Sequence, residues 1–281
     1  MSSEAVIVVG AGLTGLSATW YLHQRGIPAL LLEAEAEVGG NLRSRSEDGF
    51  LRDLGPNSLM IKGDLLPDLI RQLQLEDRVV EANPLARRRF VLNRRGHPVA
   101  LGPDVLFSSS LLSLSARLRL LSEPWRPRRP QSQNDESIAD FVRRRLGPEA
   151  LTWMVDPFVS GVFAGDPEKL SVTAALPRLA AMEAESGSLL RAALRRRRAG
   201  KKEGSSRLVS FRGGLQELPR ALAARLPPDR LALSRPLTHL QRRGELWHLQ
   251  TPAGDLECRR LVLALPAAES ARLLRAEAPE L

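Results

Sequence analysis

The chain has 281 residues, which is enough for one large domain or for two domains with a substantial core. Lys and Arg number 41 against 32 Asp and Glu, so the formal net charge of +9 favours acidic partners such as nucleic acid, anionic lipid or carboxylate ligands. Cys258 is the only cysteine, which excludes an internal disulfide and favours a reducing compartment.

Two further features bear on location. No apolar run reaches the length that a membrane span requires. Residues 1–5 lead directly into an apolar run and show neither a basic leader nor a cleavage pattern. We therefore expect a cytoplasmic protein without a secretory signal.

The first predicted elements form a strand–helix–strand unit. Residues 5–9 are a continuous run of strand formers, as in a buried parallel strand. A helix is predicted over 13–25, ended by Gly26, and a second strand over 28–32. These elements together have the length of one βαβ unit.

The turn of this unit carries the sequence Gly10-Ala11-Gly12-Leu13-Thr14-Gly15, and Glu33 ends the second strand. Gly10 allows a tight turn, Gly12 lets the backbone approach a pyrophosphate, and Gly15 lets helix and strand pack closely. Glu33 is placed to accept hydrogen bonds from ribose hydroxyls, and its charge argues against a 2′-phosphate. A βαβ turn without any ligand is the alternative that we consider less favoured.

Two later turns distinguish FAD from NAD. Gly39 and Gly40 let the backbone return to the same phosphates, beside Asn41, and Arg43 can neutralise them. The rigid turn from Asp53 through Gly55, Pro56, Asn57 and Ser58 is a candidate to line the flavin. The alternative is a plain hairpin turn in which Arg43 is a solvated charge.

The remaining elements follow in chain order. We predict helices over 64–75, 138–146, 148–156 (stopped by Pro157) and 215–226, a hairpin over 90–101, and strands over 230–241, 245–251 and 256–265. Residues 106–121 show an amphipathic pattern of leucines. We predict a loop over 122–134. Residues 195–206 are charged and then rich in Gly and Ser, which predicts a surface segment.

Three stretches, with the turn at 53–58, carry a resemblance to a known family. They are Asp156 to Ser171 (DPFVSGVFAGDPEKLS), Ser210 to Leu215 (SFRGGL) and Ala264 to Pro266 (ALP). The chain resembles the flavin-containing amine oxidase superfamily over its whole length, and within it the protoporphyrinogen/coproporphyrinogen oxidases. The resemblance implies an α/β fold: a Rossmann-type FAD-binding domain (1–82 and 207–281) with an inserted, mostly helical substrate and membrane-contact domain (83–206).

The function implied by this resemblance is FAD-dependent oxidation of protoporphyrinogen IX or coproporphyrinogen III to the porphyrin in heme biosynthesis. Electrons pass from the flavin to oxygen or another acceptor. By resemblance Arg89 pairs with a substrate carboxylate, Gly165 lets the macrocycle approach the backbone, and Leu237 offers backbone hydrogen bonds to adenine. The alternatives are a solvated arginine face, which we prefer for Arg87 and Arg88, an ordinary turn at Gly165 and strand core at Leu237.

Two departures from the family pattern stand out. The superfamily commonly has Arg where this chain has Glu37, which puts one phosphate contact in doubt. Members of the family also run well beyond 281 residues, so we expect a truncated chain. The resemblance also leaves open a homodimer and a peripheral membrane contact through 106–121, for which a core helix is the alternative.

The same residues leave other functions open. An amine or carotenoid oxidase would keep residues 1–58 but not Gly161 to Ser171, and a non-catalytic FAD-binding remnant stays open. Nucleic-acid binding has only the net charge in its favour, because aromatic residues are 4% and the arginines are dispersed. The four scattered histidines and the lone cysteine predict no metal site.

Overall fold

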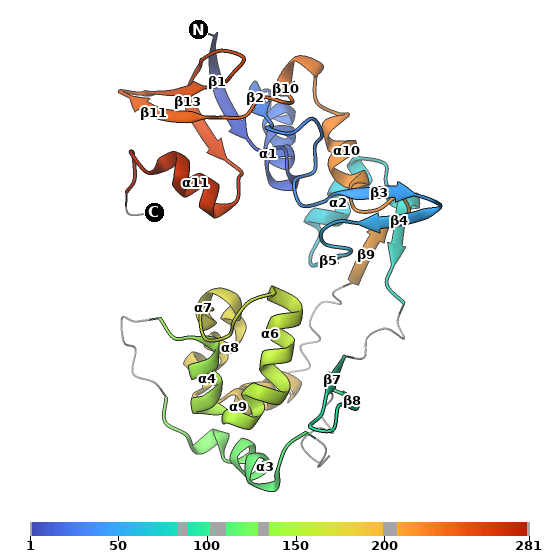
Figure 1. Cartoon of the computed structure of the whole chain (residues 1–281), viewed down its shortest axis with the longest axis vertical. Coiled ribbons are helices and arrows are strands. Elements are labelled where there is room, and N and C mark those ends of the chain that lie inside the picture. Colours follow the sequence, from blue (N-terminus) through green and yellow to red (C-terminus); the bar gives the residue numbers. More distant parts are fainter. Residues whose placement is uncertain (1, 84–88, 102–110, 129–134, 199–206, 280–281) are drawn as a thin grey trace. The chain divides into compact units, whose positions relative to one another are not determined.

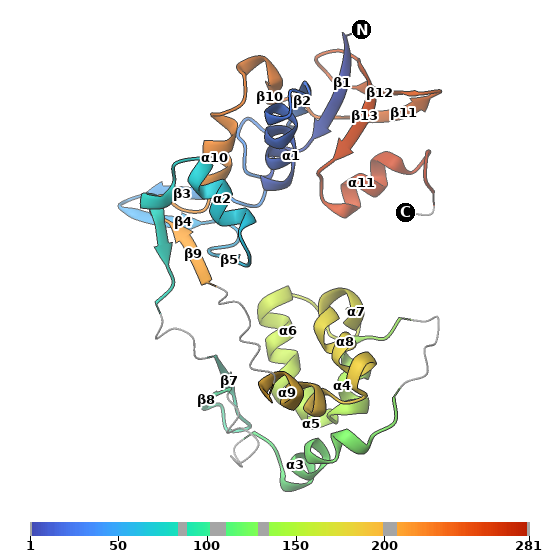
Figure 2. The same cartoon turned by 180° about the vertical axis from the view of Figure 1, so that it is seen from behind.

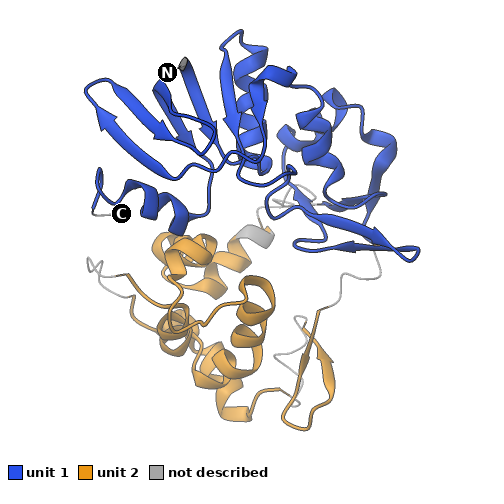
Figure 3. Cartoon of the chain, turned by 45° about the horizontal axis from the view of Figure 1, so that its top comes forward, with its two compact units in different colours: residues 1–82, 204–281 blue, residues 83–203 orange. Residues whose placement is uncertain are grey.

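The computed structural model describes residues 2–83, 89–101, 111–128, 135–198 and 207–279 (Figures 1 and 2). The chain divides into two compact units (Figure 3). Unit 1 consists of residues 1–82 and 204–281, and unit 2 consists of residues 83–203. Both ends of the chain therefore belong to unit 1, and unit 2 is inserted in its sequence.

Unit 1 is a mixed α/β structure. Its strands are β1 (Ser2–Val9), β2 (Ala29–Leu32), β3 (Ser44–Glu47), β4 (Phe50–Asp53), β5 (Leu59–Ile61), β6 (Val79–Glu81), β9 (Arg207–Phe211), β10 (Leu231–Ala232), β11 (His239–Arg243), β12 (Leu246–Gln250) and β13 (Leu256–Leu263). Its helices are α1 (Leu13–Gln24), α2 (Leu65–Gln72), α10 (Glu217–Ala223) and α11 (Ala267–Leu274), with short 3-10 turns η1 (Glu76–Arg78) and η6 (Pro228–Arg230).

The main sheet has the strand order β10-β2-β1-β13-β12-β11. β1 runs parallel to both β2 and β13, so that Val8 pairs with Leu31 on one side and Val262 on the other. β11, β12 and β13 continue the sheet as antiparallel neighbours. The parallel centre of the sheet confirms the α/β fold class.

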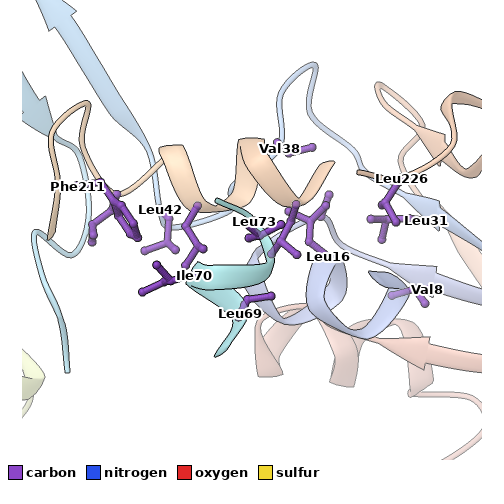
Figure 4. Close-up of a cluster of buried hydrophobic side chains, with 14 of the residues drawn as sticks. Val8, Leu16, Leu31, Val38, Leu42, Leu69, Ile70, Leu73, Phe211 and Leu226 are labelled. Carbon is purple, nitrogen blue, oxygen red and sulfur yellow. The ribbon is translucent and has the colours of Figure 1, made fainter. Parts of the chain in front are cut away.

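The apolar run of β1 is explained by burial on both faces of the sheet. Val8 belongs to one buried cluster together with Leu16 of α1 (Figure 4). Ile7 belongs to a second cluster together with Leu273 of α11. Alternate side chains of one strand thus supply two cores, which fixes the carboxyl end of β1 firmly in the middle of unit 1.

Two smaller sheets complete unit 1. β3 and β4 form an antiparallel hairpin, and β9 lies between β5 and β6. Because β9 comes after the inserted unit and β5 and β6 come before it, this sheet joins the two segments of unit 1.

Unit 2 is mostly helical. It contains the hairpin β7 (Phe90–Leu92) and β8 (Pro98–Ala100), and the helical segments α3 (Leu114–Leu121), η4 (Glu123–Trp125), α4 (Ile138–Arg145), α5 (Pro148–Ala150), η5 (Leu151–Val155), α6 (Asp156–Phe163), α7 (Val172–Ala175), α8 (Pro177–Ser186) and α9 (Leu189–Arg198). Phe141 and Val142 of α4 are buried in its core together with Val159 of α6.

The expected end of a helix at Pro157 is wrong. α5 continues through the π-helical segment η5 into α6, which contains Pro157 and ends at Phe163. In a regular α-helix a proline ring crowds the carbonyl four residues earlier. The wider π turn directly before Pro157 relieves this crowding, so the helical path continues.

The single strand expected over 230–241 is also wrong. β10 lies at one edge of the main sheet, beside β2, and β11 lies at the opposite edge, beside β12. Ser234 has a positive φ of 51°, and Pro236 has no N–H to donate. These two residues interrupt the extended backbone and let the chain cross the sheet.

Other boundaries differ locally. Residues 195–198 of the expected surface segment are helical in α9, whereas 199–206 lie outside the described residues. The amphipathic pattern over 106–121 becomes the helix α3, preceded by residues 102–110, which also lie outside the described part of the chain. The expected loop over 122–134 begins with the turn η4.

Candidate functional site

The glycine turn after β1 lies between the ends of two neighbouring strands. The backbone N–H of Gly10 donates to the carbonyl of Leu32 at 2.7 Å. Gly15 lies so close to Gly10 that a Cβ at Gly15 would overlap the Gly10 carbonyl oxygen. Gly12 caps α1 without a side-chain hydrogen bond, so the first N–H groups of this helix are available to a phosphate.

The Glu33 carboxylate lies beside this turn. One oxygen accepts from the backbone N–H of Ala11 at 2.5 Å, and the other accepts from the N–H of Glu35 at 3.0 Å. The backbone N–H of Glu33 itself donates to Ala232 of β10. Glu33 is thus held at the carboxyl edge of the parallel strands, where open α/β sheets bind ligands.

The second glycine pair lies alongside the first turn. The N–H of Gly39 donates to the carbonyl of Ala11 at 2.9 Å, and Gly39 forms a parallel bridge with Gly12. A Cβ on Gly40 would come within 3.1 Å of the Gly12 Cα. By contrast, a Cβ on Gly12 would meet only that Gly40 backbone within 4 Å, at 3.9 Å. The two loops therefore approach each other closely, but the space next to the Gly12 Cα stays open. A pyrophosphate could occupy this space.

The turn at 55–58 packs against the chain that follows this glycine pair. A Cβ on Gly55 would overlap the carbonyl oxygen of Asn41, and the N–H of Leu54 donates to the carbonyl of Arg43 at 2.7 Å. Pro56 and Asn57 are exposed, and the Ser58 hydroxyl donates to the Asn57 side chain at 3.1 Å. The three glycine-containing segments thus form one continuous cradle in unit 1.

A polar network, which the sequence analysis missed, supports this cradle. The Ser44 hydroxyl donates to Asp53 at 2.5 Å, and the same Asp53 oxygen accepts from the N–H of Leu215 at 3.0 Å. The side chain of Gln216 accepts from the N–H of Ser44 at 3.1 Å and donates to the carbonyl of Val38 at 3.2 Å. Gln216 is 172 residues from Ser44, so no local pattern reveals the pair.

A cavity of about 450 Å³ adjoins this network. It is lined by Glu35, Ala36, Glu37, Arg43, Ser44, Arg45, Ser46, Leu54, Gln216 and Arg220. Arg43 lies 3.7 Å from Glu35, and Arg220 of α10 lies 3.3 Å from Glu37. Glu37, which replaces an arginine common in the superfamily, is therefore itself paired with an arginine.

Leu237 does not belong to a strand. Its side chain is buried in the core cluster that contains Ile7 and Leu240. The adjacent N–H of Thr238 donates to the carbonyl of Gln250 at 2.9 Å. The adenine contact assigned to the Leu237 backbone stays a prediction.

The substrate candidates lie in unit 2. The Arg89 guanidinium lies over the ring of Phe158, with 5.3 Å from Cζ to the ring centroid. Gly165 follows the left-handed residue Ala164 at the end of α6, and a Cβ on Gly165 would come within 2.8 Å of Leu170. Arg87 and Arg88 lie outside the described residues.

In the described ranges, no cluster of three or more His, Cys, Asp or Glu residues could hold a metal ion. Burial raises the pKa of the Cys258 thiol to about 11, so the thiolate is disfavoured at neutral pH.

Known proteins match this chain over most of its length. The sequence profile of the family described as flavin containing amine oxidoreductase matches residues 13–281. Protoporphyrinogen oxidase 2, chloroplastic/mitochondrial, of Arabidopsis thaliana is 32% identical over 273 residues, which cover 89% of this chain and 53% of that protein. Coproporphyrinogen III oxidase of Bacillus subtilis is 28% identical over 291 residues, which cover 96% and 61%.

Solved structures show the same fold. A crystal structure from Exiguobacterium sp. 255-15, assigned as a protoporphyrinogen oxidase, matches with a TM-score of 0.77 and 27% identity, covering 100% of this chain and 63% of that one. Putrescine oxidase matches with a TM-score of 0.67 at 17% identity, covering 96% and 60%, which shows the fold alone. The chain spans about half the length of the plant relatives that it matches.

Proposed function

The chain belongs to the family of flavin containing amine oxidoreductases, and from this premise we propose that it takes part in the FAD-dependent oxidation of a porphyrinogen to a porphyrin. The names of the similar proteins support protoporphyrinogen or coproporphyrinogen as the substrate class. The observation that carries the cofactor assignment is the cradle of Gly12, Gly40 and Glu33 at the carboxyl edge of the parallel strands.

The residues of unit 1 fit an FAD molecule. The N–H groups at the start of α1 would bind the pyrophosphate, and Glu33 would accept the ribose hydroxyls. Arg43 would offset phosphate charge, and the turn at 55–58 would lie along the flavin. When bound, FAD supplies the acceptor for the hydride equivalents removed from the substrate.

The residues of unit 2 would orient the substrate. The planar guanidinium of Arg89 suits a bidentate pair with a propionate carboxylate. Its place over the Phe158 ring restricts the direction in which it can point. The approach of the macrocycle to the Gly165 backbone stays a proposal, and it requires the Leu170 side chain, which lies where a Cβ on Gly165 would be, to move aside. Oxygen or another acceptor is proposed to reoxidise the cofactor.

The first experiment is an absorbance spectrum of the purified chain after FAD addition and desalting. We expect retained flavin bands, and we expect Glu33→Gln to weaken FAD binding roughly tenfold to a hundredfold, because a hydrogen bond to a charged group contributes about 1.5–3 kcal/mol. Glu47→Gln, in the exposed β3–β4 hairpin, is the matched control and should bind FAD normally. A folded wild-type chain that retains no flavin would contradict the cofactor proposal.

Substrate class is tested next, on the flavin-loaded chain. Protoporphyrinogen IX, coproporphyrinogen III and a panel of primary amines and polyamines are compared under identical conditions. Porphyrinogen turnover with no amine turnover supports the proposal. The reverse result would assign the chain to an amine oxidase.

Location and assembly remain proposals. No helix in the described ranges is both long and apolar enough to cross a membrane. We propose a cytoplasmic protein with a peripheral membrane contact through the region that contains α3. The homodimer stays a prediction.

A further inference from the structure

The strand β7 has an arginine at each end, and each arginine lies over an aromatic ring of the same helical path. Arg89 directly precedes β7, and its Cζ lies 5.3 Å from the centroid of the Phe158 ring. Arg94 follows β7 in the hairpin turn, and its Cζ lies 5.7 Å from the centroid of the Trp153 ring. The two rings belong to the consecutive segments η5 and α6. Both ends of β7 are therefore attached to one helical path.

The two rings are five residues apart, which makes the π turn important. Five residues of a regular α-helix turn by about 500°, so Trp153 and Phe158 would point about 140° apart. In the π turn η5 the hydrogen bonds span five residues instead of four, so residues five apart come closer to one full turn. Ala150 and Val155, which are also five apart, pack in the same core of unit 2. The π turn thus lets both rings lie under the arginines of one strand.

Apolar packing completes the attachment of β7. Val91, the middle residue of the strand, is buried in a cluster against which Trp153 and Met154 of η5 also pack. Phe90 and Leu92, on either side of Val91, have exposed side chains. An isolated two-stranded hairpin is marginally stable at best in water. The position of the β7–β8 hairpin therefore depends on its contact with η5.

The two arginines differ in their charge balance. Arg94 lies 3.0 Å from Glu149, which also accepts from the backbone N–H and the hydroxyl of Ser113. These two hydrogen bonds from Ser113, together with Arg94, hold the pKa of Glu149 below its usual range. Arg89 is exposed, and no carboxylate pairs with it among the residues that the structure describes. The charge of Arg94 is thus matched within the protein, whereas that of Arg89 is available to an anionic ligand.

We infer that the π turn η5 and the Arg94–Trp153 pair fix the position of β7, and that this holds the Arg89 guanidinium where it can bind a carboxylate. Arg94 and Trp153 are positioning residues, because they act through Arg89. The identity of the carboxylate, a propionate of the porphyrinogen, rests on the proposed function, but the attachment of β7 does not. The alternative is a π turn that serves only to accommodate Pro157.

Hydrogen exchange of the whole chain tests the attachment without any substrate. Arg94→Gln and Trp153→Leu should each speed the exchange of amides in residues 89–101 by roughly twofold to fivefold, the size expected of one cation–π pair. Trp153→Phe keeps an aromatic face and should exchange like wild type. The matched control is Arg242→Gln, which removes a pair with Trp247 of the same 5.7 Å in unit 1. Unchanged exchange in Arg94→Gln and Trp153→Leu would overturn the inference.

Steady-state kinetics of the flavin-loaded chain tests the effect on Arg89. Trp153→Leu should raise KM for protoporphyrinogen IX roughly twofold to fivefold and keep kcat within about twofold of wild type. KM for the dimethyl ester should stay unchanged, because the ester has no carboxylate for Arg89 to bind. Trp153→Phe should restore the wild-type KM. An equal rise of KM with acid and ester would show general damage to unit 2 and would overturn the positioning role.

A deletion separates the role of the π turn from the needs of Pro157. Thr152 lies in η5 with an exposed side chain, and its hydroxyl donates to the carbonyl of Pro148 at 3.2 Å. Deletion of Thr152 in a Pro157→Ala chain removes the extra residue and the proline together. Because α6 would then turn by about 100°, KM for the acid should rise roughly fivefold or more. Pro157→Ala alone should stay within about twofold of wild type.

Wild-type exchange and KM in the folded deletion chain would overturn the role of the π turn. A deletion chain that does not fold leaves the decision to Arg94→Gln and Trp153→Leu, which change only side chains. A wild-type chain that oxidises no porphyrinogen would reject the proposed function but not the attachment of β7. In that case faster exchange in these two variants, but not in Arg242→Gln, supports the attachment, and equal exchange in all three overturns it.

Discussion

The Arg89 guanidinium lies over the Phe158 ring at 5.3 Å from Cζ to the centroid. Arg89 directly precedes β7, where its carbonyl accepts from the N–H of Leu101, whereas Phe158 belongs to α6. The π turn directly before α6 changes the direction of the helix faces that follow it. The contact thus joins Arg89 to a ring almost 70 residues later in the chain, on the helix that follows the π turn.

Phe158→Leu should remove the aromatic ring that restricts the Arg89 guanidinium, without changing the charge of Arg89. Within the proposed oxidation, we expect KM for a propionate-bearing porphyrinogen to rise roughly twofold to fivefold, because an exposed cation–π pair contributes about 0.5–1 kcal/mol. The kcat should stay within twofold of wild type. Steady-state kinetics measures both constants.

Phe158→Tyr is the matched control, because it keeps an aromatic face for the guanidinium. A KM that rises equally in both variants would contradict the positioning role of the ring. Arg89→Lys tests the other partner: it keeps the charge but loses the bidentate fork, so its KM should also rise.

Gly15→Ala should abolish flavin retention. The added methyl group would overlap the Gly10 carbonyl oxygen, so the turn or α1 must shift, at a cost of about 1–3 kcal/mol. Gly161→Ala in α6 is the control, since nothing lies within 4 Å of the position of its Cβ. Flavin absorbance after desalting separates the two, and normal retention in Gly15→Ala would show that this close approach is not needed.

Asp53→Ala should loosen the turn at 55–58. It leaves the Ser44 hydroxyl and the Leu215 N–H without their acceptor, which we expect to lower the free energy of unfolding by about 1–3 kcal/mol. FAD binding should weaken in parallel. Asp64→Ala, whose side chain caps no helix N–H, should change stability by less than about 0.5 kcal/mol. Denaturant titration checks both values.

Glu123→Gln should destabilise unit 2 at neutral pH. Arg145 is fully buried and donates to Glu123, whose carboxylate also accepts from Ser188, Leu189 and Leu190. Breaking a buried ion pair costs about 3–5 kcal/mol. Glu168→Gln removes an exposed partner of Arg143 instead and should cost less than about 1 kcal/mol.

The same carboxylate makes stability depend on pH. Burial opposes its ionisation, but the hydrogen bonds from Ser188 and the two backbone N–H groups, together with Arg145, hold the pKa of Glu123 below its ordinary value. Its contribution is therefore complete above an unfolded-state pKa of about 4.3 and is lost as pH falls through the lower folded value. Denaturation curves of wild type and Glu123→Gln should converge at low pH; a constant difference would contradict this account.

Local patterns predicted much of unit 1. The strand–glycine turn–helix–strand order appears as β1, α1 and β2 within a few residues of the expected bounds, because backbone preferences and burial on both faces of a strand act over short distances. The same reasoning failed at Pro157, where the π turn removes the crowding that normally ends a helix. It also failed over 230–241, where one apolar segment is divided between opposite edges of the sheet.

The sequence by itself determined the places where backbone must come close, Gly10 to Gly15 and Gly39 to Gly40, and the position of the carboxylate Glu33. Only the tertiary structure decided which distant groups would meet there: Gln216 with Ser44, Leu215 with Asp53, and Arg220 with Glu37. The reason is physical. Glycine positions and apolar periodicity constrain the local backbone. The hydrogen bond between Ser44 and Gln216, which are 172 residues apart, forms only when folding brings these two distant segments together.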